Sequence, residues 1–165
     1  MNYVDGIYQK PYDKIASKEN DPIAKQTAAM FLTQTAACEV RIPITEQVEA
    51  YSIKDFDIYL DNELLSVEVE VKHNWKLIGK WQGYPTIDVP FRKRKSKASI
   101  YILFNTHLNT LAMATMSDIQ LSPHSSKPCW NTTEPDWFYN VELDKFKFFE
   151  DQNGIWKHIS GLRYD

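Results

Sequence analysis

The sequence has few cysteines, no membrane-length run of apolar residues and no excess of positive charge. Its two cysteines, Cys38 and Cys129, do not form a CxxC pair, so neither a disulfide framework nor a zinc site is expected. The first residues contain no apolar segment of the kind that marks a secretory signal peptide. We therefore expect a cytoplasmic protein with reduced thiols and no membrane partner.

The formal net charge of −3 argues against a protein that coats duplex DNA by bulk attraction. Binding to nucleic acid would then require a local cluster of cations or a bound metal ion. Apolar side chains make up 43% and aromatic side chains 13% of the chain, which predicts a substantial core. We expect one domain over residues 1–165, with 1–20 as a lead-in arm and 121–165 as a C-terminal extension.

Local signals predict one helix near the N-terminus, followed by a series of strands. Asp21 and Pro22 match an N-cap and the first helical position, which places the helix at about 22–38. Asp61-Asn62 is a turn signal between two strand-like segments, so those segments are expected to form a hairpin. The expected strands are 39–45, 54–60, 64–72, 98–105 and 110–116.

The segment 64–72 alternates in polarity, as a strand with one apolar face does. One face is expected to carry Leu65, Val67, Val69 and Val71. The opposite face is expected to carry Ser66, Glu68, Glu70 and Lys72. Asp57 lies on the preceding strand, so we expect its carboxylate to face these glutamates across the hairpin. Asp55 has the same period, and we expect it at a turn or on the surface.

Two glutamates and a lysine on one strand face suit phosphate chemistry. Neighbouring carboxylates repel one another unless a hard cation such as Mg²⁺ or Mn²⁺ lies between them. Such an ion polarises a scissile phosphate and lowers the pKa of a bound water. The ammonium of Lys72 would lie close to that ion and orient the attacking water or stabilise negative charge. The other interpretation is a solvated strand face, where alternating charge is common.

Asp57, a hydrophobic stretch with a turn, and then Glu70-Val71-Lys72 together resemble the PD-(D/E)xK nuclease superfamily, which includes restriction endonucleases and Holliday junction resolvases. The resemblance covers about residues 22–105. It implies an α/β (mixed α+β) fold, in which helices flank a central mixed β-sheet with a restriction endonuclease-like core. It also implies a Mg²⁺-dependent endonuclease that acts on DNA, in repair or recombination, with a homodimer as one expected form.

In that superfamily the aspartate and the glutamate bind the metal, and the lysine supports the nucleophile. The resemblance therefore assigns catalytic roles to Asp57, Glu70 and Lys72, with Asp57 and Glu70 as ligands of Mg²⁺ or Mn²⁺. Glu68 is either a further metal ligand or a side chain that faces solvent. The residue before Asp57 is Phe56, where the motif has proline.

A basic run follows the proposed metal strand and precedes the next buried strand. Such cations would contact phosphates and position a nucleic acid without reading its bases. The expected nucleic-acid-binding residues are Arg92, Lys93, Arg94, Lys95 and Lys97, together with Trp75, which would stack on an unpaired base. The alternatives are a solvated run of charge, and core packing for Trp75.

Two functional hypotheses follow from these residues. The leading one is a metal-dependent nuclease that hydrolyses phosphodiester bonds in DNA, with branched or flapped DNA as a natural substrate. The other is a catalytically inactive nucleic-acid or protein-binding domain on the same fold, because function depends on the site and not on the fold. Convergence of the carboxylates of Asp57 and Glu70 with Lys72 in an open cleft would favour the enzyme.

Overall fold

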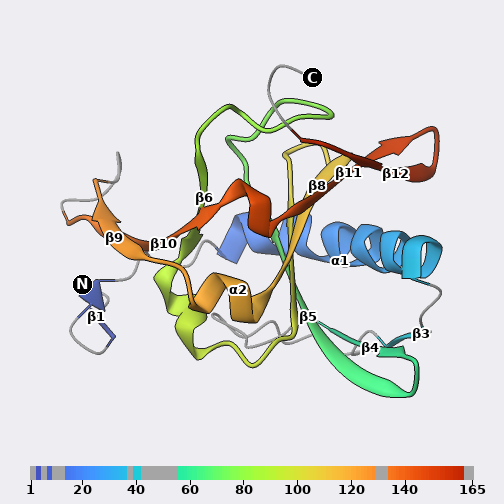
Figure 1. Ribbon diagram of the computed structural model, residues 1–165, viewed down its shortest axis with the longest axis horizontal. Coiled ribbons are helices and arrows are strands. Elements are labelled where there is room, and N and C mark those ends of the chain that lie inside the picture. Colours follow the sequence, from blue (N-terminus) through green and yellow to red (C-terminus); the bar gives the residue numbers. More distant parts are fainter. Residues whose placement is uncertain are drawn as a thin grey trace.

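The computed structural model describes residues 3–4, 7–8, 14–36, 39–41, 56–128 and 134–161. Within them a seven-stranded sheet is ordered β12-β11-β8-β7-β5-β4-β3, and a three-stranded sheet is ordered β6-β10-β9 (Figure 1). The main sheet consists of β3 (Glu39–Arg41), β4 (Phe56–Leu60), β5 (Glu63–Val71), β7 (Ile100–Phe104), β8 (Thr110–Thr115), β11 (Lys147–Gln152) and β12 (Ile155–Ile159).

The remaining elements surround this sheet. The small sheet consists of β6 (Thr86–Pro90), β9 (His124–Lys127) and β10 (Asp136–Glu142), and β1 (Tyr3–Val4) pairs with β2 (Ile7–Tyr8). The helices are α1 (Lys14–Ala36) and α2 (Met116–Gln120), with 3₁₀-helices η1 (Phe91–Lys95) and η2 (Leu143–Lys145). None of the helices described here is long and apolar enough to span a membrane.

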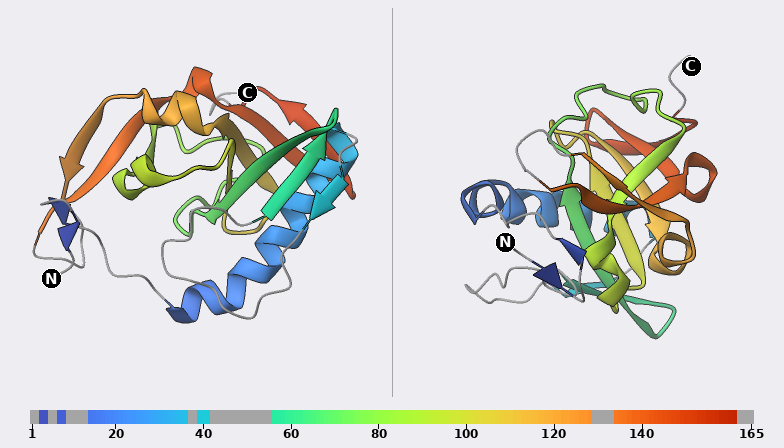
Figure 2. Two further views of the ribbon diagram at one scale, coloured as in Figure 1. Left: turned by 90° about the horizontal axis from the view of Figure 1, so that it is seen from below. Right: turned by 90° about the vertical axis from the view of Figure 1, so that its left-hand side faces the viewer.

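The main sheet is mixed, as expected for a mixed α+β fold. β5 and β7 run parallel, and all other neighbouring strands in it run antiparallel. Helices flank this sheet more sparsely than expected. α1 packs along one face, whereas the small sheet and the segment between β5 and β7 cover much of the other (Figure 2).

The alternation expected for β5 is confirmed, and it gives the sheet two different faces. The helix face is the side covered by α1, and it is apolar. Its buried side chains are Phe56, Ile58, Val67, Val69, Ile102, Phe104, Leu111 and Trp156, which pack against Ala24, Ala28, Phe31 and Leu32 of α1. The two alanines allow the helix backbone to approach the sheet closely.

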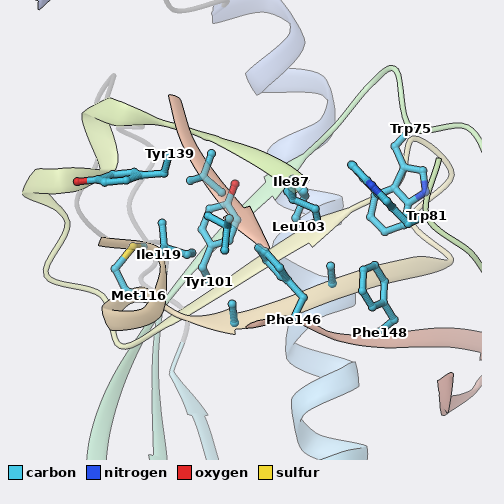
Figure 3. Close-up of a cluster of buried hydrophobic side chains, with 14 of the residues drawn as sticks. Trp75, Trp81, Ile87, Tyr101, Leu103, Met116, Ile119, Tyr139, Phe146 and Phe148 are labelled. Carbon is cyan, nitrogen blue, oxygen red and sulfur yellow. The ribbon is translucent and has the colours of Figure 1, made fainter. Parts of the chain in front are cut away.

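The crossover face is the opposite side, covered by the residue 72–99 segment and by the small sheet. A second apolar cluster occupies most of it, with Trp75 and Trp81 at one end and Met116 and Ile119 of α2 at the other (Figure 3). Tyr101 belongs to this cluster although its hydroxyl is polar. The glutamates of β5 lie on this face, beside Tyr101.

Two turns confirm the hairpins expected from the sequence. Asp61 and Asn62 both have positive φ, at 50° and 65°, which suits the two-residue turn that joins β4 to β5. β7 and β8 form the second hairpin, with Phe104 opposite Leu111 and with Leu108 at a φ of 57° in its turn.

The start of the helix differs from the expected one. α1 begins at Lys14, so Pro22 lies inside it and Asp21 is not its N-cap; that prediction was wrong. A proline inside a helix removes one backbone hydrogen bond and strains the preceding turn. The helix nevertheless continues to Ala36, and its second half is held by the apolar contacts with the main sheet. Residues 14–20 of the expected arm are therefore helical.

The C-terminal residues contribute to both sheets. β10 lies at the centre of the small sheet, and β11 and β12 extend the main sheet beyond β8. Phe148 on β11 lies opposite Ala112 and is buried on the crossover face. The sequence showed these residues only as an aromatic-rich extension, because their strand pattern is interrupted by short turns.

The connection between β5 and β7 decides what lies above the glutamates. Parallel neighbours cannot be joined by a tight turn, so the chain must cross over the sheet between them. This crossover contains β6 and η1 and no α-helix. Since β6 pairs with β10 of the small sheet, the chain leaves that sheet directly into η1 and brings the basic run onto the crossover face.

Candidate functional site

Two glutamates of β5 meet two cations of η1 above the crossover face. Lys93 Nζ contacts both Glu68 Oε1 and, at 2.6 Å, Glu70 Oε1. Arg92 Nη2 lies 3.2 Å from the same oxygen of Glu70. These four side chains and the two hydroxyl groups described next form what we call the carboxylate cluster.

Hydroxyl donors hold the other oxygen of each carboxylate. Tyr101 Oη donates to Glu70 Oε2 at 2.7 Å, and Ser96 Oγ donates to Glu68 Oε2 at 2.8 Å. Every carboxylate oxygen of Glu68 and Glu70 therefore has at least one donor. A buried carboxylate requires such compensation, because an unpaired charge is very costly away from water.

The cluster is buried at one end and partly open at the other. Glu68 and Lys93 are 3% and 7% exposed. The side chains of Glu70 and Arg92 retain 21% and 26% exposure. A ligand in solution would therefore meet Glu70 and Arg92 first, with the Glu68–Lys93 pair behind them.

The two carboxyl groups differ in acidity. Burial alone raises the pKa of Glu70, but Lys93 and Arg92, with the hydrogen bond from Tyr101, lower it to about 2. Burial raises the pKa of Glu68 and outweighs the attraction of Lys93, while the charge of Glu70 raises it further. Glu70 is therefore the firmly ionised member of the pair, and Glu68 accepts a proton more readily.

The two remaining buried donors also have shifted acidity. Burial lowers the pKa of Lys93, but Glu70 and Glu68 overcome this and raise it above its usual value. Burial raises the pKa of Tyr101 well above its usual value, and the charge of Glu70 adds to the shift. Lys93 remains a cation and Tyr101 a hydrogen-bond donor at neutral pH.

A distant helix fixes η1 in this position. Gln120, at the end of α2, donates from Nε2 to the carbonyl oxygens of Lys93 and Ser96, both at 3.0 Å. α2 is itself capped by Thr115, whose Oγ1 accepts a hydrogen bond from Asp118 N. Sequence analysis missed Ser96, Tyr101 and Gln120, because they come from different segments and no local pattern links them to the two glutamates.

Asp57 lies on the crossover face but not opposite Glu70. It pairs with Ser66 in the β4–β5 register and accepts a hydrogen bond from Ser66 Oγ at 3.0 Å. Glu68 is two residues and Glu70 four residues further along β5, so Glu70 lies about 13 Å beyond Ser66 along the strand. The register brings Asp57 closer to Glu68 than to Glu70.

Lys72 directly follows β5, and its backbone N–H donates to the carbonyl oxygen of Phe104 at 2.9 Å. This bond extends the β5–β7 ladder by one residue, so Lys72 remains near the end of the strand that carries Glu70. Lys72 and Glu70 are two residues apart, and the expectation that their side chains act together remains a prediction.

The residues expected to bind nucleic acid divide into two groups. Lys93 is buried against the glutamates, and Arg92 shares Glu70 with it. Lys95 and Lys97 are exposed and Arg94 is partly exposed, as phosphate-binding cations would be.

Trp75 was expected to stack on a base, but it is fully buried. Its indole N–H donates to the carbonyl oxygen of Lys80, and its ring meets that of Trp81 edge-on at 5.0 Å. A buried ring offers no free face to a nucleobase, so the prediction for Trp75 was wrong and its alternative, core packing, is confirmed. The predictions for Asp55, Cys38 and Cys129 concern residues outside the described ranges.

The cluster can be tested against the chemistry of a divalent cation. No group of three or more His, Cys, Asp or Glu side chains suited to a metal is found among the described residues. Two carboxylates are nevertheless sufficient for Mg²⁺, which usually keeps several waters. Glu68 and Glu70 converge on one cationic centre, the ammonium of Lys93. The two carboxylates are therefore of the donor type that a hard cation prefers, and the ammonium of Lys93 lies between them.

Comparison with known proteins adds no relative to this description. No family model matches the chain, and no curated protein or solved structure matches it significantly.

Proposed function

We propose that this chain is a metal-dependent nuclease that hydrolyses phosphodiester bonds in DNA, built on a restriction endonuclease-like core. The observation that carries the proposal is the convergence of Glu68 and Glu70 on one cation at a partly open site. α1, the β4–β5 hairpin and the parallel β5–β7 pair come in the chain order that this resemblance implies.

A bound Mg²⁺ or Mn²⁺ would polarise the scissile phosphate and lower the pKa of the attacking water. Glu70 and Glu68 would hold it, with Asp57 as the neighbouring carboxylate on the same face. Glu70 suits this role because Lys93 and Arg92, together with the hydrogen bond from Tyr101, lower its pKa and keep it ionised across the neutral range. Lys72 would orient the water, and Arg92, which is partly exposed beside Glu70, would contact the phosphate.

Lys93 has two successive roles in this proposal. Without a metal it neutralises the two glutamates and keeps them together, which limits their mutual repulsion. A divalent cation held by Glu68 and Glu70 would take over this compensation, and the ammonium of Lys93 would then be available to a phosphate oxygen. The carboxylates would be compensated by a cation in both states.

A nuclease assay with variants tests the proposal. Linear, supercoiled and branched DNA are incubated with Mg²⁺, with Mn²⁺ or with EDTA, beside Glu70→Gln and Lys72→Ala. We expect metal-dependent cleavage that falls by about 100-fold or more in each variant. Glu63→Gln is the matched control, because Glu63 is an exposed glutamate on the same strand and its loss should not change the rate. Unchanged cleavage in both site variants would refute the assignment.

The completeness of the cluster supports a second candidate, a catalytically inactive nucleic-acid or protein-binding domain. All four carboxylate oxygens already have donors from the chain, so the cluster is also self-sufficient. Calorimetric titration with Mn²⁺ separates the two candidates. The nuclease requires Mn²⁺ binding that is lost in Glu70→Gln, whereas the inactive domain predicts no binding in either protein.

A further inference from the structure

Four rings from three elements gather where η1 leaves the small sheet. Phe91 of η1 stacks on His124 of β9, with ring centroids 4.4 Å apart and planes 13° from parallel. Tyr139 of β10 meets Phe91 edge-on at 4.9 Å, and Trp137 of β10 lies 5.9 Å from His124. We call Phe91, His124, Trp137 and Tyr139 the aromatic stack.

Two of the four rings pack with the core. Tyr139 is 4% exposed and belongs to the apolar cluster of the crossover face, and Phe91 packs against that cluster. His124 is exposed, and Trp137 is partly exposed. Tyr139 and Phe91 are thus explained by packing, whereas the outer rings of His124 and Trp137 keep surface that a ligand can cover. Tryptophan is enriched at interfaces, because its ring offers a large apolar area and its N–H a polar contact.

Positive charge accompanies these rings. The guanidinium carbon of Arg94 lies 5.0 Å from the ring centroid of Phe91, in a cation–π arrangement, and Arg94 Nη1 donates to Phe91 O. Lys95 follows on the same helix and is exposed. Lys127, also on β9, forms an ion pair with Asp88 and is 43% exposed. Arg94 therefore brings one positive charge directly to the rings, whereas the charge of Lys127 is already paired with Asp88.

The aromatic stack and the carboxylate cluster share one short helix. Phe91 and Arg94 of η1 belong to the stack and its border, while Arg92 and Lys93 between them contact the glutamates. Five residues of 3₁₀-helix span only about 10 Å. The short helix therefore holds the aromatic stack and the carboxylate cluster at a fixed, short separation.

We propose that the aromatic stack binds an unpaired nucleobase of single-stranded nucleic acid, with Arg94 holding the adjacent phosphate. The inference rests on the proposed function for its substrate, and it narrows that substrate to a single-stranded end or flap. Stacking on a ring requires a free base face, which an intact duplex offers only at its ends. The sequence-based choice of Trp75 is thereby replaced by Trp137 and His124, which are accessible.

A binding experiment without metal tests this site separately from catalysis. Fluorescence anisotropy in EDTA compares a labelled single-stranded 12-mer, a duplex of the same length and an abasic 12-mer. We expect the single strand to bind at least ~10-fold more tightly than the duplex or the abasic strand. His124→Ala and Trp137→Ala should each reduce single-strand affinity by about 10-fold, and Trp137→Phe should restore most of it.

Tyr84→Ala is the matched control, because Tyr84 is an exposed aromatic residue outside the stack, at 63% exposure. Its affinity for the single strand should equal that of the unaltered protein. Equal binding of the normal and abasic strands would overturn the stacking site, as would unchanged affinity in both His124→Ala and Trp137→Ala. Base-dependent binding without cleavage would support the stacking site and refute only the nuclease. Cleavage without base-dependent binding would support the nuclease and refute only the stacking site.

Discussion

Both faces of the main sheet are covered by other parts of the chain, but the side chains on the two faces differ in kind. Below α1, adjacent strands contribute Val67, Val69 and Ile102, and the cover is apolar as well. On the other side of the same strands, Glu68 and Glu70 lie beside Tyr101, and the cover brings cations and hydroxyl groups. The same strands therefore carry an apolar helix face and a crossover face on which charged side chains are paired.

The difference indicates which face is free to carry function. Apolar packing is tolerant of exchange among side chains of similar volume, so the helix face needs no particular partner residue. A buried ion pair contributes little net stability, and a well-packed apolar replacement is often as good or better. The carboxylate cluster is thus poorly explained as a stabilising device. The proposed binding or catalytic role would give it a reason.

The largest expected effect comes from moving a charge to the wrong face. Val67→Glu places a carboxylate among apolar side chains at a position with 0% exposure. We expect it to lower the free energy of unfolding by more than about 4 kcal/mol, measured by urea denaturation. Val67→Ala is the control for lost volume, with a cost of about 2–3 kcal/mol. Equal stability of the two variants would show that both faces accept charge.

The next effect comes from removing the shared cation. Lys93→Met leaves Glu68 and Glu70 buried without it, and we expect a loss of about 3–5 kcal/mol in the free energy of unfolding. Lys95→Met on the same helix is the control, with a change within about 0.5 kcal/mol, since Lys95 is exposed.

The same variant sharpens the metal proposal. If the ammonium of Lys93 stands in for a divalent cation, Mn²⁺ should raise the Tm of Lys93→Met by several degrees more than that of the unaltered protein. A Tm of Lys93→Met that does not respond to Mn²⁺ would mean that the carboxylates do not hold a metal.

A smaller effect is expected from Tyr101→Phe. This variant keeps the ring in the crossover face and removes the hydroxyl that donates to Glu70. Loss of a hydrogen bond to a charged group should cost about 1.5–3 kcal/mol. It should also raise the pKa of Glu70, which ¹³C NMR of the carboxyl group measures directly. An unchanged pKa would contradict the assigned bond.

The smallest expected effect is the dependence of the free energy of unfolding on pH. It comes from titratable groups on the crossover face alone. The raised pKa values of Lys93 and Tyr101 mean that the folded state keeps protons that the unfolded state loses above about pH 10. Their contribution to stability is complete below that pH and is lost as the pH rises further. Urea midpoints between pH 8 and 11 should show this fall, and Lys93→Met should flatten it.

On the acid side the two glutamates act in opposite directions. The pKa of Glu70 is lowered to about 2, so its contribution is present above its ordinary pKa and is lost as the pH falls toward 2. The raised pKa of Glu68 favours the folded state when Glu68 is protonated, which offsets part of that loss. The loss of stability as the pH falls toward 2, measured by urea denaturation, should therefore be smaller in Glu70→Gln than in the unaltered protein.

Features that depend on neighbouring residues followed from the sequence. The alternation of β5 assigned Val67 and Glu68 to opposite faces, and the turn at Asp61-Asn62 joined β4 to β5. The same local reasoning failed at Pro22, which looked like a helix start although α1 begins at Lys14. It also failed at Trp75, whose burial depends on β8, the C-terminal strands and the 73–85 loop.

The sequence by itself determined that Glu68 and Glu70 share a face, because side chains alternate along any strand. Tertiary structure alone decided what that face meets. Lys93 reaches Glu68 from 25 residues away, because the crossover leaves the small sheet into η1 and Gln120 holds η1 in place. Backbone geometry fixes the alternation of side chains along a strand, whereas the path of a crossover depends on contacts from the whole chain. Only the folded structure therefore shows that the cations of η1 pair with these glutamates.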